Sequence, residues 1–95
     1  MPKTRYKLRI PDSVAELVRN THPHVRKKIR SALKIILTDP HEGKALKDEL
    51  KGIRSFSVSR FRIIYRTSRK NEIEIIAIGP RERIYEETLR ILKNE

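Results

Sequence analysis

The chain has 95 residues, enough for one domain spanning residues 1–95 and too few for two independent cores. It carries 23 Lys and Arg against 12 Asp and Glu, and this net charge of +11 favours polyanionic partners, either nucleic acid or an acidic protein. The absence of cysteine excludes disulfides. No apolar run approaches the roughly 18–20 residues of a membrane span, and the first residues lack a signal-peptide pattern, so we expect a cytoplasmic protein with no membrane partner.

The first part of the chain predicts a strand followed by a helical hairpin. Residues 6–10 alternate apolar and basic side chains, which is the period of a half-buried strand. Pro11-Asp12-Ser13 offers helix-start chemistry, and the short helix that follows should end near residues 20–22. Pro23 stands at an early position of a second helix. The apolar stripe of this helix comprises Val25, Ile29, Leu33 and Ile36.

The second part of the chain predicts three strands and a last helix. Residues 39–43 form a turn cluster, and residues 44–53 read as a loop with a helical turn. Strands are expected over 55–59, 61–67 and 72–78, with a polar hairpin turn at 67–71. Residues 82–93 return to a helical pattern that places Tyr85, Leu89 and Leu92 on one face. The expected fold is therefore α+β, with a mostly antiparallel sheet.

Strand alternation predicts which side of the sheet each residue occupies. Phe61, Ile63 and Tyr65 should face the helical hairpin, which needs a large apolar surface, so Arg62 should emerge on the opposite face. In the last strand, Ile76 and Ile78 should share one face, and Ile73, Ile75 and Ala77 the other. A strand that is apolar on both faces belongs at the centre of a sheet, partly covered here by the C-terminal helix.

These residues resemble the RelE/ParE superfamily of toxins from type II toxin–antitoxin modules. The resemblance covers essentially the whole chain and rests on four segments, which are Leu46-Lys47 with Leu50-Lys51-Gly52, Ser55-Phe56, Phe61-Arg62-Ile63-Ile64-Tyr65, and Ile78-Gly79-Pro80-Arg81. It implies the RelE-like order of strand, helix, helix, three strands and C-terminal helix. It also implies a cognate acidic antitoxin as partner.

In RelE-like toxins the resemblance implies an endoribonuclease that cuts mRNA in the ribosomal A site. By motif position, Arg62 would stabilise the transition state, Arg81 would bind phosphate or donate a proton, and Tyr85 would orient the substrate base. Arg83 lies beside them and is expected to bind RNA. The residues themselves allow other interpretations, because each arginine could be a solvated surface residue and Tyr85 could pack in the core.

Arginine suits one part of RNA cleavage better than the rest. Its planar fork engages two phosphate oxygens at once, but its pKa lies far above working pH, so it transfers protons poorly. His22, His24 and His41 all fall around the helical hairpin in sequence, away from the arginine strands. We therefore expect electrostatic stabilisation and alignment without a metal or cofactor, and without a histidine acid–base pair.

The second strand departs from the RelE pattern, because Ser57 and Ser59 stand where the family's enzymes often carry basic residues. Arg60, Lys51 and Lys47 are candidates to supply the missing positive charge to RNA. Two further functions stay open. ParE-like members of the superfamily inhibit DNA gyrase, and a degenerate toxin could act only with its antitoxin as a transcriptional corepressor.

Overall fold

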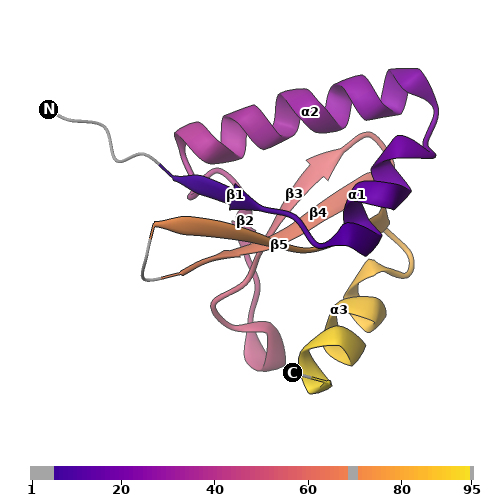
Figure 1. Cartoon of the computed structure of the whole chain (residues 1–95). Coiled ribbons are helices and arrows are strands. Elements are labelled where there is room, and N and C mark those ends of the chain that lie inside the picture. The colour runs from indigo at the N-terminus through magenta and orange to yellow at the C-terminus, as the bar shows by residue number, and fades with distance from the viewer. Residues whose placement is uncertain (1–5, 69–70, 95) are drawn as a thin grey trace, which may run out of the picture.

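The computed structural model describes residues 6–68 and 71–94 and shows an α+β fold built on one five-stranded sheet (Figure 1). The strands lie in the order β1-β5-β4-β3-β2, with β1 parallel to β5 and every other pair antiparallel. The elements in chain order are β1 (Lys7–Arg9), α1 (Asp12–Arg19), α2 (Pro23–Thr38), β2 (Lys44–Ala45), the 3-10 turn η1 (Asp48–Leu50), β3 (Arg54–Val58), β4 (Phe61–Thr67), β5 (Glu72–Pro80) and α3 (Ile84–Lys93).

The predicted fold class and element order are confirmed, with changes to some boundaries and one additional strand. Within the predicted loop 44–53, β2 forms a short edge strand that pairs with β3 ahead of η1. β5 runs on to Pro80, two residues beyond the predicted end. α3 begins at Ile84, not at residue 82, because Arg83 donates its backbone N–H to Pro80 O over 3.1 Å and closes a turn there. None of the described helices has the length and apolar character of a membrane span.

The larger core lies between the sheet and the helical hairpin α1–α2, which covers one face (Figure 1). The predicted stripe of α2 is buried here at Ile29, Leu33 and Ile36. From the sheet, Val58, Ile63 and Tyr65 pack against it. The predicted assignment of these strand residues to the hairpin side is therefore confirmed.

A smaller apolar cluster occupies the opposite face, under α3 and η1. Its buried members are Ile53, Ile64, Ile76, Ala77 and Ile84. Three partly buried leucines pack against this cluster. They are Leu46, which precedes η1, Leu50, which ends it, and Leu92 of α3. Because β5 is buried on both faces and lies between β1 and β4, its predicted central position is confirmed.

A β-bulge in β5 corrects the predicted alternation of this strand. Ile64 pairs with Ala77 while the next residue, Tyr65, pairs with Ile75, so Ile76 is the extra residue. Beyond the bulge the faces exchange, and Ile78 packs with the hairpin core while Ala77 joins the α3 side. The bulge therefore also places Gly79 on the same face as its cross-strand partner Arg62.

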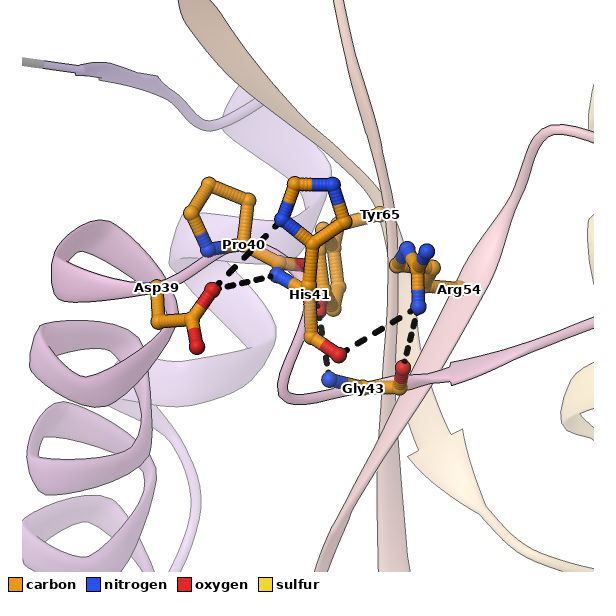
Figure 2. Close-up of polar contacts among 6 residues, drawn as sticks. All are labelled: Asp39, Pro40, His41, Gly43, Arg54 and Tyr65. Atoms are coloured by element: carbon orange, nitrogen blue, oxygen red, sulfur yellow. Dashed lines mark hydrogen bonds and ion pairs between the residues drawn. The ribbon is translucent and has the colours of Figure 1, made fainter. Parts of the chain in front are cut away.

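A polar network holds the segment between α2 and β2 against the sheet (Figure 2). The hydroxyl of the fully buried Tyr65 donates to Pro40 O over 2.7 Å and accepts from the backbone N–H of Gly43 over 2.9 Å. Arg54 Nη1 donates to Gly43 O over 2.7 Å and to His41 O over 3.3 Å. Burial raises the pKa of Tyr65, so its phenol stays protonated and able to donate at neutral pH. This network fixes where the short edge strand β2 begins.

Candidate nucleic-acid interface

Arg62 lies in β4 on the face covered by α3, as the strand alternation predicted. Its neighbours across the sheet are Ser57 of β3 and Gly79 of β5, both small. The side chain is half-buried, and its Nη1 donates to Phe61 O over 3.1 Å. Among the described residues Arg62 forms no ion pair with a carboxylate, so most of its donors are free to bind an anion.

Three more arginines come from chain segments that meet at the same end of the sheet. Arg60 lies in the tight β3–β4 turn, where Ser59 has a positive φ of 55°. Arg81 follows β5, and its backbone N–H donates to Arg60 O over 3.0 Å, which joins the two segments. Arg83 lies at the start of α3, and all three side chains are exposed. We call Arg60, Arg62, Arg81 and Arg83 the arginine cluster.

Tyr85 extends from the first turn of α3 across to β3. Its hydroxyl lies 3.4 Å from the hydroxyl of the buried Ser55, and its side chain is 36% exposed. The buried positions of α3 are instead Ile84 and Thr88, with Leu92 packed beside them. The interpretation of Tyr85 as a core residue is therefore wrong. The ring remains available to a ligand on the face that carries Arg62.

Lys47 and Lys51 flank η1 and are both exposed, at a distance from the arginine cluster. They precede β3, whereas the arginine cluster lies around the turn at the other end of that strand. Figure 1 shows η1 near the C-terminal end of α3 and the β3–β4 turn at the opposite end of β3. The fold thus brings the segments that carry the four arginines together and keeps the two lysines apart from them.

One histidine is closer to this region than its sequence position suggested. His24 of α2 lines the same groove as Ser57 and Ser59, so α2 brings it close to the β3–β4 hairpin despite its distance in sequence. Its ring stacks on that of His22, with centroids 5.5 Å apart. His41 lies in the network around Tyr65 and is 3.5 Å from Asp39. The nearness of His24 to Ser57 and Ser59 results from the packing of α2 over β3, and the local sequence around His24 does not indicate it.

A glycine beside Arg62 lets α3 pack closely on β5. A Cβ added to Gly79 would lie 3.1 Å from Cδ1 of Ile84, the first residue of α3. We expect Gly79→Ala to cost about 1 kcal/mol of unfolding free energy, because the first turn of α3 must shift to accommodate the methyl group. Urea unfolding would measure this cost, and an unchanged or higher midpoint would contradict the close packing of α3 on β5.

The described residues include no group of three or more His, Asp or Glu side chains that could hold a metal ion. The interface is instead defined by arginine donors, hydroxyl groups and one aromatic ring. A planar guanidinium binds phosphate oxygens in pairs, and an exposed tyrosine ring offers a surface on which a base can stack. This combination of groups suits a single-stranded nucleic acid.

Comparison with known proteins relates the chain to toxins. The toxin RelE from E. coli, solved in the free state with two arginines replaced by alanine, has a TM-score of 0.76 to this chain at 18% identity. The match covers 92% of this chain and 97% of that one. The toxin–antitoxin complex RelBE2 from Mycobacterium tuberculosis gives 0.71 at 20% identity, covering 84% and 95%. The YoeB–YefM complex from Staphylococcus aureus gives 0.64 at 21% identity, covering 80% and 97%. No curated protein matches the sequence.

The structural likeness at these identities shows a shared RelE-like fold. The family is shown by the sequence itself, because residues 5–85 match the model of the ParE toxin of the type II toxin–antitoxin system parDE. That match includes the whole sheet, the helical hairpin and the arginine cluster. The chain therefore belongs to the ParE toxin family of type II toxin–antitoxin systems, within the RelE/ParE superfamily.

Proposed function

We propose that this toxin is a ribosome-dependent endoribonuclease that cleaves mRNA in the A site and so inhibits translation in the cytoplasm. The observation that carries the proposal is the arginine cluster, in which the β3–β4 turn, the start of β4 and the turn after β5 bring four arginines to one end of the sheet. Tyr85 and the hydroxyls of Ser55 and Ser57 lie on the same face as Arg62. A neutralising antitoxin is the expected protein partner, and RelE and YoeB proteins have been solved in complexes with their antitoxins.

The proposed reaction is attack of a ribose 2′-oxygen on the adjacent phosphorus. A new P–O bond forms to the 2′-oxygen while the bond to the 5′-oxygen of the next nucleotide breaks, leaving a 2′,3′-cyclic phosphate. The 2′-hydroxyl loses a proton and the departing 5′-oxygen gains one. Arg62 is assigned to the charge that builds up on the non-bridging oxygens, and Arg81 to the phosphate or the leaving oxygen. Tyr85 is assigned to stacking on the base.

Among the described residues of the site, none is well suited to act as the general base. Ser55 and Ser57 are neutral hydroxyls, and no described carboxylate is paired with the cluster. Rate acceleration would then come mainly from positioning the 2′-oxygen in line and from stabilising the phosphorane, with the ribosome holding the mRNA. Such a mechanism predicts little cleavage of free RNA.

Purified ribosomes programmed with a short mRNA test the proposal. Primer extension should show new 3′ ends within the A-site codon when the protein is added, and the same mRNA without ribosomes should stay intact. Cuts in the free RNA, or an intact message on the ribosome, would contradict the proposal.

Inhibition of DNA gyrase is a second candidate, favoured by the match to a ParE family model and by the serines on β3. A supercoiling assay with purified gyrase separates the two functions. Loss of supercoiling with an intact message on the ribosome would select the gyrase inhibitor.

A further inference from the structure

Ser55 is a buried polar residue on the face of the sheet that α3 covers. It is the second residue of β3 and is only 6% exposed. Its partner across the sheet is Ile64 of β4, a member of the apolar cluster on this face. A hydroxyl on such a surface is costly to bury unless it forms a hydrogen bond. The bond available to it is with the hydroxyl of Tyr85, over 3.4 Å, and none of the described buried side-chain nitrogens or oxygens lacks a partner.

Tyr85 is held at both ends of its side chain. It is the second residue of α3, and the first turn of this helix is fixed on the sheet by the fully buried Ile84 and Thr88. Thr88 Oγ1 donates to Ile84 O over 2.7 Å within the same turn. The hydroxyl of Tyr85 is held from the other side by Ser55. Because a tyrosine side chain has only two rotatable bonds, an anchor at each end leaves the ring little freedom to change its orientation.

This anchor places the ring of Tyr85 next to Arg62. Ser55 pairs with Ile64, and Ser57 with Arg62, so Arg62 is the diagonal neighbour of Ser55 on the same face. Diagonal positions in an antiparallel pair are roughly 7–8 Å apart, within reach of long side chains. The aromatic ring and the guanidinium are therefore presented from adjacent positions of one surface.

The direction of the hydroxyl decides which part of Tyr85 a ligand can meet. The hydroxyl is engaged at the sheet, whereas the side chain as a whole is 36% exposed. The part left for a ligand is therefore the ring. A ring already held in one orientation loses less conformational entropy when a base stacks on it than a freely rotating ring does.

We propose that Ser55 is a positioning residue, whose hydroxyl holds the phenol of Tyr85 against β3 and so presents the ring as a fixed stacking surface. The ligand is a base of a single-stranded nucleic acid whose phosphate binds at Arg62. The inference rests on the proposed function for the nature of the ligand and on the structure for the anchoring of the ring. Tyr85 acts through its ring and does not supply a proton.

Two labelled oligonucleotides separate stacking from attraction by charge. One is a hexamer of deoxyadenosine, which has no 2′-hydroxyl and so cannot be cleaved by the proposed reaction. The other has the same number of sugars and phosphates but no bases. Since the phosphate charge is equal, the ratio of the two dissociation constants reports contacts to the bases. By fluorescence anisotropy we expect the wild type to bind the hexamer with bases about tenfold more tightly. A wild-type ratio near one would overturn the inference.

Three variants test whether Ser55 acts through Tyr85. Ser55→Ala and Tyr85→Phe remove the two ends of the same bond, so each should lower the ratio by about threefold, and the double variant should lower it no further. Tyr85→Leu should bring the ratio close to one, because no ring remains. A ratio unchanged by Ser55→Ala, or losses that multiply in the double variant, would contradict the role of Ser55. A ratio that survives Tyr85→Leu would place the base elsewhere and would also overturn the proposal.

Thr88→Val is the matched control for a merely structural effect. It also removes a fully buried hydroxyl close to Tyr85 on the same helix, but this hydroxyl bonds to Ile84 O and not to the phenol. The ratio should stay close to the wild-type value, because the Ser55–Tyr85 bond is intact. A loss as large as that of Ser55→Ala would mean that the ratio follows the packing of α3, and would contradict the proposal.

Cleavage on the ribosome separates this inference from the proposed function. If the wild type cuts mRNA in the A site, Ser55→Ala should lower kcat/KM by about threefold, and Thr88→Val should leave it close to the wild-type value. A wild-type protein that leaves the message intact would count against the proposed function. The ratio of the oligonucleotide affinities would then still decide whether Ser55 positions Tyr85.

Discussion

Replacing Arg62 with alanine is expected to lower the rate of mRNA cleavage on the ribosome by about 10²–10³-fold, which is the usual effect of removing one preorganised donor from a developing negative charge. Arg62 is the member of the arginine cluster that is half-buried and fixed on a strand, with Ser57 and Gly79 beside it. A donor held in this way needs little reorganisation as the phosphorane forms. The measurement is the single-turnover rate of A-site cleavage at saturating toxin.

Arg66→Ala is the matched control for this experiment. Arg66 lies on the same strand and face but at the other end, where its Nε donates to Glu74 Oε1 over 2.6 Å. Because this pair is about one third exposed, its loss should cost at most about 1 kcal/mol of stability and should leave the cleavage rate within about threefold of wild type. Equal rates for Arg62→Ala and the wild type would remove Arg62 from the site. Equal losses in both variants would indicate a general dependence on positive charge.

Gly43→Ala is expected to lower the free energy of unfolding by about 3 kcal/mol. A Cβ at this position would overlap the hydroxyl of Tyr65 and lie 2.9 Å from its Cε1 and Cζ atoms. Overpacking of a buried site typically costs 1–3 kcal/mol, and displacement of the ring weakens the bonds from Tyr65 to Gly43 and Pro40 by about 1 kcal/mol more. For a domain of this size the melting temperature should fall by about 15 °C, measurable by circular dichroism.

A double-mutant cycle with Tyr65→Phe identifies the cause. Alone, Tyr65→Phe should cost about 2–3 kcal/mol, because the N–H of Gly43 and the carbonyl of Pro40 lose their buried partner. In that background Gly43→Ala should cost clearly less than in the wild type, since the overlapping hydroxyl is gone. Gly52→Ala controls for substitution of a glycine as such, because a Cβ there meets open space and only the backbone at φ of 90° is strained. Strictly additive costs would contradict a clash between Gly43 and Tyr65.

The parts of the fold that could be predicted are those indicated by the spacing of apolar residues within a single helix or strand. The stripe of α2 and the alternation through Phe61, Arg62 and Ile63 each depend on neighbours within one element, and both are confirmed. The strand β2 could not be found in this way. Its two residues are exposed, and it exists because Tyr65 and Arg54, which are distant in sequence, fix the turn that leads into it.

In the candidate site, too, the residues marked by local sequence could be predicted, and those that depend on tertiary packing could not. Motif position and strand alternation were enough to select Arg62, Arg81 and Arg83 as candidate site residues. The structure places their segments together. The position of Tyr85 was ambiguous, because helical spacing shows that residues share a face without showing which face is buried. The nearness of His24 to Ser57 and Ser59 arises from how α2 crosses the sheet, which no local pattern encodes.

The extra residue at Ile76 determines which face of the sheet each later side chain of β5 occupies. If β5 paired with β4 without the bulge, Ile76 would lie opposite Ile64, and every side chain from residue 77 to the end of the strand would exchange sides. Gly79 would then turn toward the helical hairpin, and Ile84 of α3 could no longer pack closely over a glycine beside Arg62. The geometry around Arg62 thus depends on an irregularity that is buried within the sheet.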